Sequence, residues 1–197
     1  MPSDFPRRAP LPRGYALCLV RHGITAPQQE RRYCGHSDPP LSGEGVRQMQ
    51  ALKERLAGLL RSGTPAFTSD LRRSVESAEI LRPASMTPLP ELRELDFGAW
   101  EGKRYADTGC QDPEALRAPD FRFPGGEGLT ELLARVQAGW RRILAATDDL
   151  QVSQVLIVAH AGSLAALTLT LRSLPREQFW DLQLPYAGVR WIDQECS

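Results

Sequence analysis

The chain is poor in lysine. Only Lys53 and Lys103 are lysines, and the rest of its 24 basic residues are arginines. Acidic residues also number 24, so the formal net charge is +0. A balanced chain has no global field that would attract nucleic acid or an anionic membrane surface. We therefore expect neither nucleic acid nor a membrane as a partner.

Cysteine is also scarce, with four residues and no Cys-x-x-Cys pair, so neither a zinc site nor a disulfide framework is expected. No apolar run approaches the roughly 20 residues of a membrane span. Residues 1–14 carry arginines and prolines without an apolar segment, so we interpret them as a flexible N-terminal arm rather than a secretory signal. These absences together predict a reduced, cytoplasmic protein.

The chain does have the length and apolar content for a single core. Its 197 residues are 42% hydrophobic and 24% charged, which is ordinary for one globular domain, expected here over residues 15–197. The segment 154–159 is an almost continuous apolar run, typical of a strand buried on both faces of a parallel sheet. The sequence therefore predicts an α/β fold with a mostly parallel central sheet.

Apolar residues at helical spacing predict helices between the strands. Ser42 is expected to cap the first helix, whose apolar face extends from Val46 to Leu59 and packs on the sheet. The other predicted elements are helices at 71–81, 129–144 and 178–182, a brief strand within 83–90, a loop over 91–102 and a last strand at 189–192.

Polar side chains follow directly after three predicted strands. If these strands are parallel neighbours, the clusters meet at one edge of the sheet, where ligands bind in open α/β folds. Two histidines and two arginines, without lysine, a P-loop or the spacing of metal ligands, suit a phosphate. The strands and the clusters that follow them are 15–20 with Arg21, His22 and Gly23; 66–69 with Asp70 and Arg73; and 154–159 with His160.

Histidine is one of the few side chains that form covalent intermediates as nucleophiles. Its neutral imidazole attacks through one nitrogen, while the other usually donates its proton to a backbone carbonyl. The pair Arg21 and His22 therefore suggests phosphoryl transfer to His22. The alternative from these residues alone is a histidine satisfied at a strand end beside a surface arginine.

From Leu17 onward the chain resembles the histidine phosphatase superfamily, also called phosphoglycerate mutase-like. Arg21-His22-Gly23 with Thr25 looks like its first motif, and the segment 68–73, Thr-Ser-Asp-Leu-Arg-Arg, is similar to its second. Glu94, four residues before Gly98, matches the acid of that family, and His160 matches its second histidine. The resemblance implies a three-layer α/β/α sandwich.

The resemblance also implies a role for each matching residue and no cofactor or metal. His22 would be the nucleophile, Glu94 the general acid and base, and Arg21, Arg73 and a protonated His160 the phosphate ligands. The expected partner is a small phosphorylated metabolite, and a homodimer is compatible with the sequence. Candidate substrate contacts are Thr25, Gln28, Gly35, His36 and Ala161.

Three positions depart from the usual family pattern. Gln28 stands where an asparagine is common, Ile24 stands where an acidic residue is frequent, and Ala161 replaces the first glycine of His-Gly-Gly. Three local segments resemble the α-ribazole phosphatases of cobalamin biosynthesis, so α-ribazole 5′-phosphate is the expected substrate. The segments are 33–36, 126–128 and the C-terminal region around 179–193.

Two other functions remain open from the sequence. One is a phosphatase of the same family with broad specificity or with phosphoglycerate, sugar phosphates or nucleotides as substrates. The other is a phosphate-binding module without catalysis. The presence of four matching residues disfavours it: His22, Arg73, Glu94 and His160. Among other polar residues, Asp70 is expected to cap its helix or orient arginines, Arg72 to be solvated or to hold an anion, and Glu127 to orient an arginine or a loop.

Overall fold

The computed structural model describes residues 15–108, 116–118, 120–148 and 152–193; the predicted arm, residues 1–14, lies outside them. A five-stranded sheet in the order β3-β2-β4-β1-β5 forms the centre of the fold. All neighbouring strands are parallel except β1 and β5, which confirms the mostly parallel sheet. The strands are β1 Ala16–Arg21, β2 Pro65–Thr68, β3 Ser85–Pro88, β4 Gln154–Ala159 and β5 Val189–Asp193.

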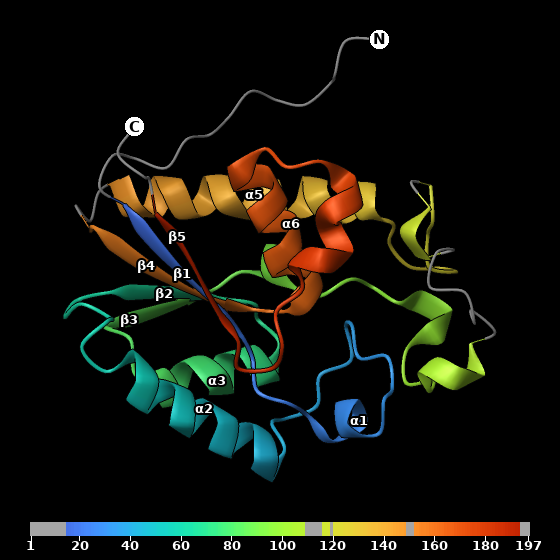
Figure 1. The fold of residues 1–197 in the computed structure, drawn as a ribbon, viewed down its shortest axis with the longest axis horizontal. Helices are drawn as coiled ribbons and strands as arrows, with labels where there is room; N and C mark the ends of the chain where they lie inside the picture. The colour runs from blue at the N-terminus through green and yellow to red at the C-terminus, as the bar shows by residue number, and fades with distance from the viewer. Residues whose placement is uncertain (1–14, 109–115, 119, 149–151, 194–197) are drawn as a thin grey trace, which may run out of the picture.

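Helices cover both faces of the sheet, so the predicted three-layer α/β/α arrangement is confirmed (Figure 1). Helices α5 and α6 lie on one face, and α2 and α3 lie on the other. The helices are α1 Ala26–Gln29, α2 Gly43–Leu56, α3 Arg72–Leu81, α5 Leu129–Asp148 and α6 Ala161–Arg172, with 3₁₀ helices η1 Pro90–Leu92, η2 Gly98–Trp100, η3 Tyr105–Asp107 and η4 Arg176–Leu182.

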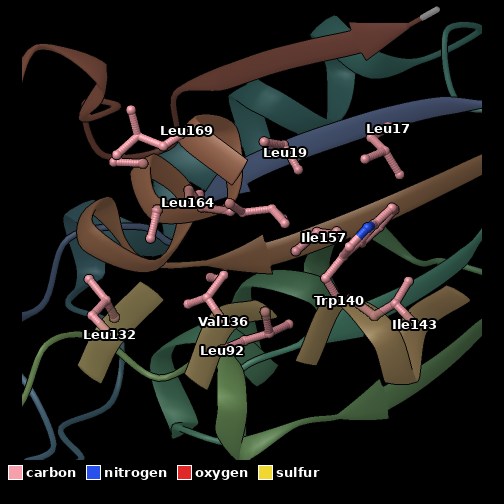
Figure 2. Close-up of a cluster of buried hydrophobic side chains, with 14 of the residues drawn as sticks. Leu17, Leu19, Leu92, Leu132, Val136, Trp140, Ile143, Ile157, Leu164 and Leu169 are labelled. Atoms are coloured by element: carbon pink, nitrogen blue, oxygen red, sulfur yellow. The ribbon is translucent and has the colours of Figure 1, made fainter. Parts of the chain in front are cut away.

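Side chains of the central strands alternate between two apolar cores. Leu17 and Leu19 of β1 face the core beneath α5 and α6, whereas Cys18 and Val20 face the core beneath α2 and α3. Figure 2 shows the first core, in which Trp140 of α5 is only 1% exposed. Every residue of β4 is buried, as expected for a central strand of a parallel sheet.

Helix α2 begins where the sequence predicts and ends earlier. The Ser42 hydroxyl accepts a hydrogen bond from the Gly45 N–H at 3.1 Å, which confirms the predicted cap. The helix stops at Leu56, and two residues later Gly58 adopts a φ of +80°, which a helix cannot continue through. Leu59 is consequently 55% exposed, so the prediction that it packs on the sheet is wrong.

The register of the three central strands places their carboxyl ends side by side. Val20 of β1 and Thr68 of β2 both pair with Val158 of β4. The residues that follow these strands therefore meet at one edge of the sheet, as the sequence predicts. Within the described ranges, no helix combines the length and apolar character needed to cross a bilayer.

Candidate active site

His22 lies directly after β1 and is 1% exposed. Its Nδ1 lies 2.7 Å from the Gly23 carbonyl oxygen. In the tautomer that this contact favours, Nδ1 carries the proton and Nε2 carries the lone pair. The backbone is held as well, because the His22 N–H donates to the Ala159 carbonyl at 3.0 Å. The ring is therefore fixed in position and direction.

His160 follows β4, precedes α6, and is fully buried. Its ring stands edge-on to that of His22, with 4.8 Å between the ring centroids. His160 Nε2 lies 3.5 Å from the Ser74 hydroxyl oxygen, while Nδ1 has no hydrogen-bond partner. The two strand ends thus bring both histidines into contact.

Arg73 is fully buried in the first turn of α3. Its Nη1 donates to the Ser37 carbonyl at 2.7 Å and its Nη2 donates to the Gly35 carbonyl at 2.6 Å. Its Nε has no partner. A buried guanidinium bonded to carbonyls still needs a negative charge, so an anion fits this position. The adjacent Arg72 is exposed and pairs with Glu76 at 2.6 Å, as the solvated alternative predicts.

Arg21 is held by the segment that leads into β5. Its Nη1 donates to the Leu184 carbonyl at 2.7 Å, and its guanidinium carbon lies 3.8 Å from the centre of the Tyr186 ring. Its Nε is buried without a partner, like Arg73 Nε and His160 Nδ1. Buried polar atoms without partners are rare in protein interiors, and together these three nitrogens suit the oxygens of a phosphoryl group.

Burial and charge keep both histidines neutral. Burial first, and then the positive charges of Arg73 and Arg21, hold the pKa of His22 well below its ordinary value of 6.5. Burial and Arg73 lower the pKa of His160 in the same way. A neutral His22 is the form that can attack an electrophile. His160, in contrast, is neutral in the ligand-free protein rather than protonated, because burial disfavours its charge.

Glu94 follows the 3₁₀ helix η1 and is 7% exposed. Its Oε1 accepts hydrogen bonds from the N–H groups of Leu95 and Gly162, each at 2.9 Å. Gly162 belongs to the first turn of α6. The carboxyl group is thus fixed by backbone groups.

Glu94 and Arg21 line a cavity of about 340 Å³. They are the two charged side chains among the described residues that line it. Six of the other thirteen described lining residues are aromatic, so the cavity suits a flat, largely apolar group attached to the phosphate. The aromatic lining residues are Tyr33, Phe97, Tyr105, Phe123, Trp180 and Tyr186.

The five candidate substrate contacts divide into two groups. Gln28 and Ala161 line the cavity. Thr25 is fully buried and donates from its hydroxyl to Gln28 Oε1 at 3.0 Å. The Gly35 carbonyl accepts from Arg73, and His36 Nε2 lies 3.0 Å from the Glu94 carbonyl oxygen. The last three therefore support the site rather than line its cavity.

Other polar residues also support the site. Asp70 does not cap α3, whose N-cap residue is Leu71; its carboxylate binds Arg93 through two contacts of 2.5 and 2.7 Å instead. Glu127 binds Arg135 at 2.6 Å. Within the described part of the chain, no group of three or more histidine, cysteine, aspartate or glutamate side chains is arranged to hold a metal ion.

Sequence reasoning missed Tyr186 and Arg135. Tyr186 lies in an irregular connection between η4 and β5, where no motif or period marks it. Arg135 stands next to the buried apolar positions Leu132 and Val136 of α5. A charged residue beside the apolar face of a helix needs a polar partner in the interior, and this is the signal from which the sequence could have identified it.

A three-layer α/β/α fold with this edge of histidines and arginines belongs to the phosphoglycerate mutase-like class. Residues 17–196 match the family model described as histidine phosphatase superfamily (branch 1). A Proteus mirabilis protein described as "Probable phosphoglycerate mutase GpmB" is 37% identical over 190 residues, which are 91% of this chain and 85% of that protein. The chain therefore belongs to the histidine phosphatase superfamily and is an enzyme of the phosphatase kind.

Solved structures show the same relationship. The α-ribazole phosphatase from Shigella flexneri superposes with a TM-score of 0.75 at 28% identity, covering 92% of this chain and 91% of that one. A mycobacterial glucosyl-3-phosphoglycerate phosphatase in complex with VO3 gives a TM-score of 0.77 at 26% identity, covering 90% of this chain and 92% of that one.

Proposed function

We propose that the protein is a metal-independent phosphomonoesterase that works through a phosphohistidine at His22. The observation that carries this proposal is the state of His22: a buried, neutral imidazole whose Nδ1 is held by the Gly23 carbonyl oxygen at 2.7 Å. That contact leaves the Nε2 lone pair free to attack.

The reaction takes two steps. In the first, His22 Nε2 attacks phosphorus, the bond from phosphorus to the ester oxygen breaks, and Glu94 gives its proton to the departing oxygen. In the second, Glu94 takes a proton from water as that water attacks the phosphohistidine. Phosphate leaves, and His22 and Glu94 return to their starting states. Glu94 thus acts as acid and then as base.

The arginines supply most of the electrostatic stabilisation. Arg21 and Arg73 bind the equatorial oxygens of the transferring phosphoryl group, where positioning and charge dominate catalysis. His160 contributes a hydrogen bond from its ring N–H. A bound phosphoryl dianion opposes the effect of the neighbouring arginines and favours a protonated His160. The protonated form expected from the sequence therefore belongs to the complex rather than to the ligand-free protein.

We propose α-ribazole 5′-phosphate as the substrate. The aromatic wall of the cavity supports this choice, since Tyr33, Phe123 and Trp180 offer ring faces and edges to a flat heterocycle. The similarity to the α-ribazole phosphatase from Shigella flexneri supports it as well.

A phosphatase for phosphoglycerate, a sugar phosphate or a nucleotide is the second candidate. The names of the Proteus mirabilis and mycobacterial relatives favour a phosphoglycerate-like compound. A substrate of that kind carries a carboxylate and needs a second cation near the phosphate. Arg21 is the one cation among the described lining residues, and the phosphoryl group already occupies it. The lining therefore favours a leaving group without a carboxylate.

The substrate is tested by phosphate release in the presence of EDTA. The panel contains α-ribazole 5′-phosphate, 3-phosphoglycerate, a sugar phosphate and nucleotides. We expect the highest kcat/KM with α-ribazole 5′-phosphate. Comparable activity on all compounds would retain the phosphatase and remove the pathway assignment, while phosphate binding without any turnover would indicate the catalytically silent module.

The mechanism is tested by His22→Ala. We expect turnover to be abolished, while inorganic phosphate still binds through Arg21, Arg73 and His160. Steady-state assays give the turnover, and calorimetric titration gives the binding. Acid quenching of wild-type enzyme during turnover of a ³²P-labelled substrate should trap label on His22, and His22→Ala should trap none. Normal turnover by His22→Ala would rule out the phosphohistidine.

A further inference from the structure

Arg135 of α5 uses three of its N–H groups on the segment that carries Glu94 and the other two on Glu127. Its Nη1 donates to the carbonyls of Glu91 and Arg93 at 3.1 and 2.9 Å. Its Nη2 donates to the Glu94 carbonyl at 3.1 Å and to Glu127 Oε2 at 2.6 Å. Its Nε donates to Glu127 Oε1 at 2.8 Å. A guanidinium has five such donors, so none remains for another ligand.

Glu127 completes the attachment from the other side. Besides pairing with Arg135, its Oε2 accepts from the Asp96 N–H at 3.1 Å. The Glu127 backbone N–H donates to the Asp96 carbonyl at 2.9 Å. The segment 91–96 is therefore tied to Arg135 and Glu127 on both sides of Glu94. The side chains of Arg135 and Glu127 are 19% and 18% exposed, so water screens this pair weakly.

Neither residue lines the cavity, whereas Glu94 does. Glu94 is held at both of its ends. Its carboxyl group accepts from the Gly162 N–H of α6, and its backbone carbonyl oxygen contacts Arg135 and His36 Nε2. Only a planar fork reaches three carbonyls and a carboxylate at once, which a lysine ammonium cannot do. Proton transfer demands this accuracy, because a shift of about 1 Å can cost roughly 100-fold in rate.

We propose that Arg135, together with Glu127, is a positioning pair that fixes Glu94 for proton transfer to the leaving oxygen. This inference rests on the proposed acid role of Glu94. It makes a specific demand on kcat/KM, which reports on phosphoryl transfer to His22 and not on the later hydrolysis of the phosphohistidine: the pair should affect kcat/KM only when the leaving oxygen needs a proton. A merely structural role would slow all substrates alike.

The test compares two leaving groups in Arg135→Gln, with Arg142→Gln as the matched control. Arg142 lies on the same helix and pairs with the Glu91 side chain at 2.6 Å, but it is 58% exposed and far less constrained. An alkyl phosphate needs protonation of its leaving group, whereas p-nitrophenyl phosphate does not. We expect Arg135→Gln to lower kcat/KM about 10- to 100-fold for the alkyl phosphate and less than about threefold for p-nitrophenyl phosphate.

Arg135→Lys should give the same selective loss, since a lysine retains the positive charge but lacks the planar guanidinium with its five donors. Arg142→Gln should behave as the wild type, and the affinity of Arg135→Gln for inorganic phosphate should be unchanged. Equal loss with both substrates in Arg135→Gln would overturn the inference. If that variant fails to fold, Glu127→Gln keeps the shape of the pair and should show the same selectivity to a smaller extent.

Glu94→Gln in the same assay separates this inference from the proposed function. A selective loss in Glu94→Gln without one in Arg135→Gln and Glu127→Gln overturns the positioning pair and retains the acid. No selective loss in Glu94→Gln removes the acid role itself and the positioning pair with it.

Discussion

At the scale of single residues, Arg21 shows how neutral groups orient a cation. The Tyr186 ring lies 3.8 Å below its guanidinium carbon, and the Leu184 carbonyl accepts from Nη1 at 2.7 Å. Neither contact neutralises the charge, so the arginine keeps its attraction for an anion. Both contacts restrict its rotamers before the ligand arrives, which reduces the entropy lost on binding.

Replacement of the Tyr186 ring should therefore weaken anion binding. A cation–π contact that is partly desolvated contributes about 0.5–2 kcal/mol, so Tyr186→Leu should reduce the affinity for inorganic phosphate roughly twofold to thirtyfold. Tyr186→Phe keeps the ring and should bind as the wild type does. Calorimetric titration measures both variants. Equal affinities for the leucine and phenylalanine variants would show that the ring does not orient Arg21.

The residues that sequence reasoning found and those it missed differ in a physical way. His22 and His160 follow apolar strands directly, so their place at the sheet edge follows from the strand register. Arg135 and Tyr186 act through contacts with segments distant in the sequence. Such contacts depend on how helices and loops pack, which a single sequence does not encode in any local pattern.

At the scale of elements, the N-terminus of α6 joins the two halves of the site. His160 precedes this helix as its N-cap residue, and the Gly162 N–H donates to Glu94 Oε1 at 2.9 Å. A side chain at position 162 would have its Cβ atom well inside contact distance of that oxygen. The glycine is thus required for the close approach of carboxyl group and helix, not for an unusual backbone angle.

Gly162→Ala should displace the Glu94 carboxyl group and lower kcat at least about tenfold, since proton transfer tolerates little misplacement. Affinity for inorganic phosphate should change little, because the added Cβ atom would meet Glu94 and Leu95 and none of the proposed phosphate ligands. Gly43→Ala, in the first turn of α2, is the control: its Cβ would meet only the distant end of Arg47. Steady-state kinetics measures kcat in both variants. A wild-type kcat in Gly162→Ala would show that the close approach of Gly162 to the Glu94 carboxyl group does not matter for catalysis.

Helices and strands were predictable where an apolar pattern is bounded by a residue that signals the start or the end of the element. Ser42 marks the start of α2, and the apolar run before His160 defines β4. The end of α2 was misplaced because Leu59 fits the helical period, although Gly58 redirects the chain before it. The predicted helix near 178–182 is the 3₁₀ helix η4, since side-chain spacing distinguishes poorly between tight and regular turns over so few residues.

At the scale of the whole molecule, folding and the site are coupled through buried ionisable groups. The two apolar cores on either side of the sheet enclose the strands whose ends carry His22 and His160. Folding therefore moves two imidazoles from water into a buried region that Arg73 makes positive. The unfolded chain exposes both rings, which then titrate near their ordinary pKa of 6.5.

This coupling predicts that stability falls in mild acid. The folded pKa values of His22 and His160 are lowered, so below about pH 6.5 the unfolded chain binds protons that the folded protein does not. Stability is complete above that pH and decreases as the pH falls from there toward the folded values. Each histidine contributes up to about 1.4 kcal/mol per pH unit, so we expect a loss of about 2–3 kcal/mol between pH 7 and pH 5.5.

Urea unfolding at a series of pH values measures this loss, and His160→Gln tests its origin. That variant removes one of the two buried imidazoles, so its free energy of unfolding should depend on pH about half as steeply. Inorganic phosphate should flatten the wild-type curve as well, because a bound dianion favours protonation of His160 in the folded protein. An equally steep curve in His160→Gln would mean that other groups bind the protons, and the two histidines would then not link folding to the charge of the site.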